Sequence, residues 1–281
     1  MRGAGAALRE APLAGAVLLL WALAALAAPW LPLEPDRIEL ARILAPPGGE
    51  AGLLGADELG RPVLDRLVAG ARTSFLAAAA VVTLSAVVGA AVGLVAGYAG
   101  GWIDLVLARL IDVFLAFPGI LLAIALAGIL GPGLANVVVA LAATGWVGYA
   151  RLVRAQAMSL RSREHVAAAR ALGAGHARIL LRHVLPLALA PLLVEASFGV
   201  AAVVIAEAGL SFLGLGVQPP QASWGAMIRD GVRYMLVAPH LVLAPGAALA
   251  LVVLAVNRLG DALRDALDVR LRAGGAAARP A

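Results

Sequence analysis

Long runs of apolar residues constrain this chain more than any other feature, because they exceed what the core of a soluble domain contains. Six segments approach or reach the roughly 20 mainly apolar residues that a helix needs to cross a bilayer. They are Leu13–Leu31, Phe75–Tyr98, Val113–Leu130, Leu134–Ala150, Leu187–Ile205 and Met235–Val256. Only 14% of the residues are charged, against roughly a quarter in soluble domains. The sequence therefore predicts an all-α, polytopic membrane protein with six transmembrane helices.

Turn and proline signals refine these spans. Gly131-Pro132-Gly133 separates the third segment from the fourth and predicts a tight turn. Gly209–Met227 is rich in glycine and proline and predicts an irregular external loop. The first segment resembles a secretory signal as far as Ala25–Ala27, but its apolar stretch exceeds the about 7–15 residues of a signal core. We interpret it as an uncleaved membrane anchor.

The distribution of arginine predicts the orientation, because cytoplasmic loops of membrane proteins carry an excess of basic residues. With the N-terminus inside, 15 arginines lie on the cytoplasmic side and 7 on the opposite side. Both termini are therefore expected in the cytoplasm.

The polar segments between the spans divide the chain. Residues 1–33 are expected to hold a cytoplasmic N-terminus and the first transmembrane helix, and residues 34–72 an external segment. Within it, Pro62–Arg72 has an apolar face, and fits either a short interfacial helix on the bilayer surface or a lead-in to the second span. Residues 73–272 are expected to form the core, with five transmembrane helices, and residues 273–281 a disordered tail.

The cytoplasmic loop at residues 151–186 has a helical pattern. Ser159–Leu172 lacks glycine and proline, and Gly173 follows it as a helix C-cap. A second helical stretch, His176–Leu185, leads to Pro186 at the membrane. Small residues between the two helices favour a knob that another protein encloses, whereas the charge content alone is typical of a solvated basic loop.

Several classes of chemistry are excluded by what the chain lacks. All 22 basic residues are arginine, so there is no P-loop lysine to bind nucleotide phosphates. There is no cysteine, which excludes disulfides and thiol chemistry. The arginines lie beside membrane segments rather than in one patch, which argues against nucleic acid as a partner.

Candidate catalytic and metal motifs are incomplete. Gly209–Gly214 resembles a nucleophile elbow around Ser211, but leucine stands where its second glycine is required. Gly173-Ala174-Gly175 lacks the third glycine of a dinucleotide loop. No carboxylate or cysteine lies at metal-ligand spacing from the four histidines, His165, His176, His183 and His240. We expect no enzyme activity, no metal site and no cofactor in this chain.

Two carboxylates fall within the fifth apolar region. Glu195 lies in the middle of the span and Glu207 near its outer end. Ionisable groups at membrane depth are costly and usually face a bundle interior or a water-filled path. Both are candidates for a translocation path, with Glu207 equally compatible with an interfacial side chain that reaches water.

The loop Glu164–Ala174, with the sequence EHVAAARALGA, is followed by Arg178-Ile179 and His183–Pro186. Together these segments resemble the EAA loop of binding-protein-dependent ABC importer permeases. More narrowly, the chain resembles the second permease subunit of dipeptide, oligopeptide and nickel importers from about Leu54 to Arg272. The supporting stretches are Gly55–Arg61, Gly100–Asp104, Leu210–Pro220, Ser223–Gly225 and Asn257–Asp265.

This resemblance implies the type I ABC importer permease fold in a bacterial inner membrane. It implies a path for peptides or a related small solute, shared with a sister permease and driven by two ATP-binding subunits. An external solute-binding protein would feed the path. In the family the EAA loop is a coupling helix held in a groove of the ATPase. Matching coupling residues here are Glu164, Ala168, Ala169, Arg170, Gly173, Ala174, Ile179 and Pro186.

The chain departs from the family pattern at four positions. Ala167 replaces the glutamate that names the EAA motif, and Pro62 replaces an aspartate. Leu187 replaces an asparagine, and Glu195 stands where relatives are usually uncharged. Two other functional classes fit the sequence less well. A polytopic membrane enzyme needs a catalytic constellation that the sequence lacks, and a secondary transporter usually shows two related halves, of which there is no sign.

Overall fold

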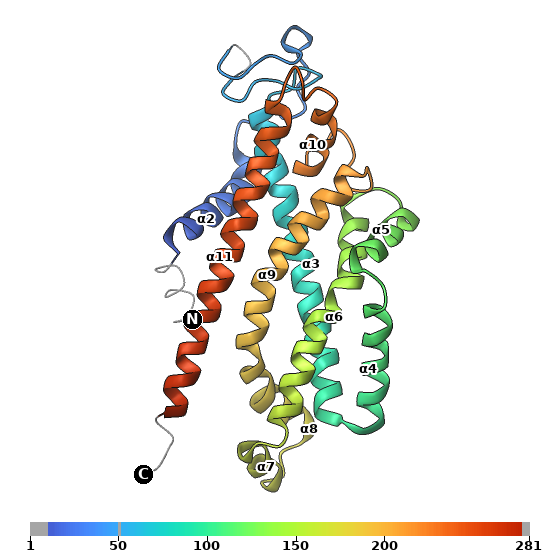
Figure 1. The fold of residues 1–281 in the computed structure, drawn as a ribbon, viewed down its shortest axis with the longest axis vertical. Coiled ribbons are helices and arrows are strands. Elements are labelled where there is room, and N and C mark those ends of the chain that lie inside the picture. Colours follow the sequence, from blue (N-terminus) through green and yellow to red (C-terminus); the bar gives the residue numbers. More distant parts are fainter. Residues whose placement is uncertain (1–10, 50–51, 277–281) are drawn as a thin grey trace.

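The computed structural model describes residues 11–49 and 52–276, with side chains as far as residue 267. These residues form an elongated bundle of helices (Figure 1), and among them the only β pairings are two isolated bridges. The helices are α2 Pro12–Ala27, α3 Val63–Ala99, α4 Gly101–Leu115, α5 Gly119–Leu130, α6 Leu134–Leu160, α7 Glu164–Ala171, α8 His176–Ile179, α9 Leu185–Phe212, α10 Trp224–Val232 and α11 His240–Ala276. Short 3₁₀ turns lie at Ala28–Trp30 and Leu40–Arg42, and a π-helical turn lies at Leu180–Val184.

Five of the described helical segments are long and apolar enough to cross a membrane individually. The pair α4 and α5 passes the same test jointly, which gives six spans if the pair counts as one. The predicted all-α membrane protein with six spans is confirmed in this sense.

The third span differs from the sequence prediction of one helix at Val113–Leu130. It begins earlier, at Gly101, and bends by 82° between α4 and α5. The break falls at Phe117-Pro118, where Pro118 has ψ 118° and precedes the first residue of α5. Proline lacks an N–H donor and disfavours the helical conformation in the residue before it. The apolar run is therefore continuous in sequence although the helix is not.

The separate interfacial helix expected at Pro62–Arg72 is absent, because α3 runs without a break through this region. The alternative, a lead-in to the second span, is the correct one. Its apolar face packs on protein: the Trp224 Nε1–H donates to the Leu67 carbonyl at 3.0 Å and the Trp21 Nε1–H to the Ala71 carbonyl at 3.1 Å. These contacts attach α10 and α2 to the N-terminal end of α3.

Other element boundaries also shift. The helix predicted at Ser159–Leu172 is two helices, since α6 ends at Leu160 and α7 begins at Glu164. The stretch His176–Leu185 is helical as predicted, but it continues through Pro186 into α9. Helix α11 reaches Ala276, four residues into the predicted disordered tail. Residues 1–10 of the predicted cytoplasmic N-terminus and residues 277–281 of the tail lie outside the described residues.

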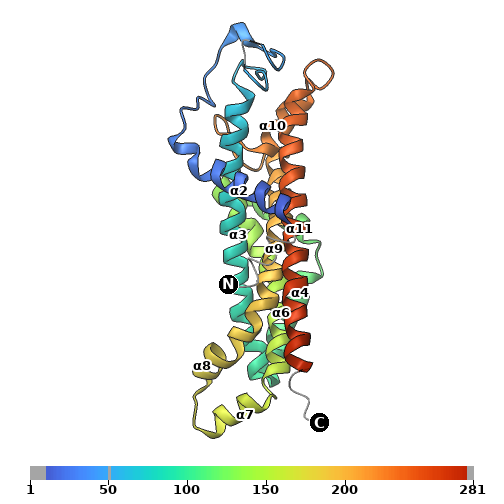
Figure 2. The same ribbon diagram turned by 90° about the vertical axis from the view of Figure 1, so that its left-hand side faces the viewer.

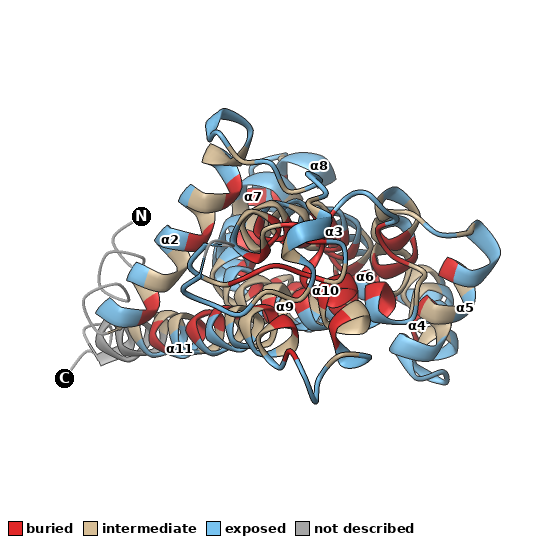
Figure 3. Cartoon of the chain, turned by 90° about the horizontal axis from the view of Figure 1, so that it is seen from above, coloured by how far each residue is buried: buried red, intermediate tan, exposed pale blue. Residues whose placement is uncertain are grey.

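The centre of the bundle is the contact between α3 and α6 (Figure 2). Gly89 and Gly93 of α3 face α6 so closely that an added Cβ would lie 2.5 Å from the Trp146 and Ala150 carbonyl oxygens, respectively. Small residues allow such approach between membrane helices. Viewed from above, buried residues gather where α3, α6, α9 and α10 meet, and much of the outer surface of α2 and α5 is exposed (Figure 3).

Candidate coupling loop and solute path

Helix α7 projects from one end of the bundle, beyond the ends of α3 and α6, and α8 lies beside that end (Figures 1 and 2). The eight predicted coupling residues divide into two groups there. The exposed ones are Glu164, Ala168, Arg170, Gly173 and Pro186. Ala174 is half-buried, whereas Ala169 and Ile179 are buried. The structure thus separates a surface that a partner can reach from the residues that hold this surface in place.

A Schellman motif ends α7. Gly173 has φ +82°, the left-handed conformation predicted for a glycine C-cap. The Ala174 N–H donates to the Ala169 carbonyl at 3.0 Å and the Gly173 N–H to the Arg170 carbonyl at 3.0 Å. These two bonds satisfy carbonyl groups that the helix end would leave unpaired. The turn after α7 therefore has a defined shape.

Buried apolar side chains fasten α7 to the bundle. Val166, Ala169 and Ile179 belong to one cluster with Leu160 at the end of α6 and Val184 before α9. Val166, Ile179 and Val184 have no exposed surface at all. The loop is consequently a packed extension of α6 and α9, and the prediction of a plain solvated loop is wrong.

Aromatic contacts add a second attachment that the sequence did not reveal. The Arg170 guanidinium lies 6.0 Å above the ring of Tyr98, the second-last residue of α3. The Tyr98 hydroxyl is hydrogen-bonded to His176 Nδ1 at 3.1 Å. Arg170 and His176 therefore connect α7 and α8 to α3, so that Arg170, predicted as a coupling residue, also takes part in this attachment.

Glu195 lies at the middle of the long helical segment His176–Phe212, 19 residues after its start and 17 before its end. At 1.5 Å per residue these distances are about 28 and 26 Å. Its side chain is exposed, and it lines two cavities of about 300 and 960 Å³. A charge at this depth costs roughly 2.5–3.5 kcal/mol on insertion scales, so contact with a cavity is the arrangement expected of it.

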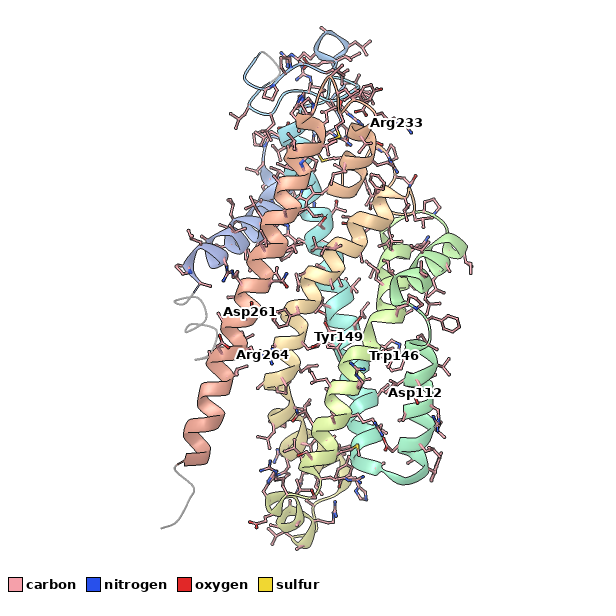
Figure 4. All side chains as sticks on the ribbon, in the orientation of Figure 1. Asp112, Trp146, Tyr149, Arg233, Asp261 and Arg264 are labelled. Atoms are coloured by element: carbon pink, nitrogen blue, oxygen red, sulfur yellow. The ribbon has the colours of Figure 1, made fainter. Side chains whose placement is uncertain are left out.

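The two cavities lie on different sides of α9. The smaller is bounded by α3, α5, α6 and α9 and is mostly apolar, with Tyr149 and Ser85 among its polar residues. The larger is bounded by α6, α7, α9 and α11 and includes Arg163 and Arg264. Figure 4 labels Tyr149 on α6 and Arg264 on α11.

Glu207 is completely buried, so the alternative of an interfacial carboxylate that reaches water is wrong. The Ser74 hydroxyl donates to its Oε2 atom at 3.0 Å and the Ser211 hydroxyl to its Oε1 atom at 2.7 Å. Neither cavity beside Glu195 is lined by Glu207. The Ser74 bond joins α9 to α3, whereas Ser211 lies four residues further along α9 itself. Because Ser74 is 133 residues away, this partner gave no local signal.

A buried ionic cluster, which the sequence did not predict, stabilises the segment at residues 34–72. Arg61 Nε lies 2.6 Å from Asp57 Oδ2, and Arg66 Nε lies 3.4 Å from the same oxygen. Arg61 also pairs with Glu58 at 2.9 Å. Burial, with a contribution from Asp57, raises the pKa of the Glu58 carboxyl despite the nearby Arg61 guanidinium. The cluster holds the Gly55–Arg61 stretch over the outer end of α3.

A second ion pair joins α4 to α6. Arg154 of α6 donates two hydrogen bonds to Asp104 of α4, from Nε to Oδ1 at 2.5 Å and from Nη2 to Oδ2 at 2.8 Å. Such bidentate geometry fixes orientation as well as distance. Asp104 belongs to the Gly100–Asp104 stretch noted in the sequence, and this pairing gives that stretch a structural purpose.

Residues 89–273 match the family described as the binding-protein-dependent transport system inner membrane component. The chain belongs to this family. Three relatives are each aligned with 91% of this chain. They are a glutathione transport system permease of Pectobacterium atrosepticum (43% identical, 85% of that protein), a di/tripeptide transport system permease of Pseudomonas aeruginosa (43%, 86%) and a nickel transport system permease of Escherichia coli K12 (42%, 92%).

The fold agrees with this membership. A chain in a structure of the MetNI methionine ABC transporter in inward-facing conformations matches with a TM-score of 0.56. The match covers 73% of this chain and 98% of that one, at 20% identity, and so supports the fold alone. The protein is a permease subunit of an ABC importer and a multi-pass inner membrane protein, not an enzyme. Family membership implies partnership with ATPase subunits and a substrate-binding protein.

Proposed function

We propose that this chain and a sister permease form the membrane path of an importer for di- or oligopeptides or a related small solute. The support for the solute class is the function named for three relatives, which belong to a glutathione, a di/tripeptide and a nickel transport system. Both termini lie in the cytoplasm in this proposal, with α7 on the cytoplasmic side, as the arginine distribution indicates.

The observation that carries the proposal is the packed, Schellman-capped α7 at the end of the bundle. ATPase closure must reach the membrane helices as a rigid-body movement, so the contact has to be stiff. Buried Val166 and Ala169 supply the stiffness, and exposed Ala168 and Gly173 permit close approach of a partner groove. Exposed Glu164 lies at the first turn of α7, where it can set the register of the contact.

Ala167 changes the character of this contact. It is exposed on α7 and replaces the carboxylate of the family motif. The ATPase contact is therefore expected to depend on packing more than on charge, and to tolerate added salt.

The path is proposed to run along Glu195, which is exposed to both cavities beside α9. Glu207 is left out of the path, since its carboxyl is enclosed by Ser74 and Ser211.

Reconstitution tests the proposal. The chain purified alone is expected to hydrolyse no ATP, because it has no P-loop lysine. In proteoliposomes with its sister permease, ATPases and binding protein, it is expected to accumulate a radiolabelled dipeptide such as alanyl-alanine. ATP hydrolysis stimulated by the binding protein without accumulation of any dipeptide or tripeptide would refute the solute class while leaving the importer intact. Absence of stimulation in the complete assembly would refute the proposed coupling.

A further inference from the structure

Three oxygen-bearing side chains line the smaller cavity, and each of them lies next to a glycine. Ser85 Oγ lies 2.8 Å from the position of a Cβ added at Gly145, and Glu195 Oε1 lies 3.7 Å from that of a Cβ added at Gly148. All four residues line the cavity. Side chains larger than hydrogen at these positions would fill the space in front of the oxygens.

Tyr149 completes the group. Its hydroxyl lies directly against Gly199 of α9, where an added Cβ would collide with it. Gly145 and Tyr149 are four residues apart on α6, as Glu195 and Gly199 are on α9, so each pair lies on one helix face about 6 Å apart along the axis. The serine hydroxyl and the carboxylate thus lie beside Gly145 and Gly148 of α6, and the phenol lies beside Gly199 of α9, all in the lining of one cavity.

Two of these polar groups lack a bonding partner among the described residues. Ser85 is 2% exposed and its hydroxyl has no hydrogen-bond partner in the described part of the chain. Glu195 forms no ion pair with another described residue. A buried hydroxyl without a partner calls for a ligand. The exposed carboxylate beside it is free to pair with a cation.

We propose that Glu195, Tyr149 and Ser85 form a binding site for a primary ammonium group of the transported solute. An ammonium group has three N–H donors and one positive charge, and the three side chains offer three oxygen acceptors and one negative charge. The aromatic face of Tyr149 adds an attraction for cations. The inference rests on the proposed solute path and names the chemical group that this path recognises.

The size and lining of the cavity fit a small solute. Its volume of about 300 Å³ is at the lower end of ligand pockets. Val81, Leu141 and Val203 contribute apolar walls that suit a side chain or methylene stem next to the ammonium group.

The larger cavity on the other side of Glu195 carries the opposite charge, because Arg163 and Arg264 line it. A zwitterionic peptide has an ammonium group at one end and a carboxylate at the other. Held at Glu195 by its amino terminus, such a peptide would direct its carboxylate toward arginine on the way to the cytoplasmic end. This order of charges favours a peptide over a simple inorganic cation.

A binding measurement without the solute-binding protein isolates the site. The probes are alanyl-alanine and its N-acetyl derivative, which lacks the ammonium charge, and binding to the purified permease–ATPase complex is followed by equilibrium dialysis. The wild-type complex is expected to bind the free amine at least about 10-fold more tightly, the lower end for a hydrogen bond to a charged group. Glu195→Gln is expected to bring the two affinities within about 2-fold, and Glu195→Asp to restore part of the preference.

Matched variants separate the site from general damage. Tyr149→Phe and Ser85→Ala each remove one acceptor and are expected to reduce the preference by a smaller factor. Asp112→Asn removes an exposed carboxylate on α4, away from both cavities, and is expected to leave the preference unchanged.

Equal affinity of the wild-type complex for the two probes, or an undiminished preference in Glu195→Gln, overturns the ammonium site. Binding of Ni²⁺ that is lost in Glu195→Gln, without any dipeptide preference, replaces it with a metal site. ATP hydrolysis stimulated by the binding protein is measured on the same preparations. Its presence keeps the importer function even where the ammonium site fails.

Discussion

Gly173 offers the sharpest test of coupling, because strain and bulk can be changed there separately. Its φ of +82° lies in the left-handed region, and no atom lies within 4 Å of the position of an added Cβ. Any side chain at this position therefore points into open space in the permease itself. What a side chain costs within this chain is backbone strain, about 1–2 kcal/mol for a residue with a Cβ.

Three substitutions use this geometry. Gly173→Asn keeps the left-handed conformation at little cost, since asparagine tolerates it. Gly173→Ala adds the strain with almost no bulk, and 1–2 kcal/mol corresponds to roughly a 5- to 30-fold change in the population of the formed C-cap. Gly173→Trp adds the same strain together with an indole that a closely fitting groove cannot accept. Buried Val166 and Ile179 hold α7 in all three variants, so membrane insertion is expected to persist.

The assay is ATP hydrolysis by the reconstituted complex with and without the solute-loaded binding protein, together with co-purification of the ATPase. Stimulation is expected to be near wild type in Gly173→Asn and partly reduced in Gly173→Ala. In Gly173→Trp it is expected to be abolished, with the ATPase detached or uncoupled and the sister permease still bound. Full stimulation by the Gly173→Trp complex would show that α7 and its turn are not the coupling element.

Three further predictions concern topology and stability. Reporter fusions are expected to report outside after Gly48 and Ala222 and inside after Arg163 and Arg270, and an outside signal at Arg163 contradicts the orientation. Gly93→Val forces a Cβ to within 2.5 Å of the Ala150 carbonyl and is expected to destabilise the bundle by about 1–3 kcal/mol, measured as a lowered melting temperature in detergent. Gly128→Val, at a helical position with open space around it, is the control and is expected to melt near the wild type. The pKa of the Glu58 carboxyl is raised above its ordinary 4.5. Its contribution to stability is therefore present at low pH and falls as the pH rises through the raised pKa. Glu58→Gln is expected to flatten the plot of melting temperature against pH in this range.

The sequence predicted the number of spans and the glycine C-cap that ends α7 because both depend on local patterns. Length and hydropathy locate α3 and α9, and Gly173 marks the end of α7 by its conformational freedom alone. The bend at Pro118 was missed because the apolar run continues across it, so that hydropathy contains no sign of the break.

Contacts between distant segments were beyond the reach of these patterns. Ser74 and Glu207 are 133 residues apart, and Asp104 and Arg154 are 50 apart. Which of two carboxylates near the fifth span is enclosed and which is exposed depends on how α3 and α10 pack against α9, and spacing along one helix cannot reveal it. The same limit applies to Ala168 and Ala169, adjacent in sequence, of which one faces outward and the other is buried.

The shape of α9 relates the two parts of the proposed function to each other. Helix α9 is the last part of a continuous helical segment, which begins with α8 at His176, passes through the π-helical turn at Leu180–Val184 and ends at Phe212. Ile179 near its start packs with Val166 of α7, and Glu195 lies about 24 Å further along the axis. A displacement of α7 by the ATPase therefore acts on the same continuous helix that carries the carboxylate between the two cavities. Because the end of this helix near α10 is tied to α3 through Glu207 and Ser74, the expected movement is largest at the end beside α7, where the larger cavity lies, and smallest beside α10.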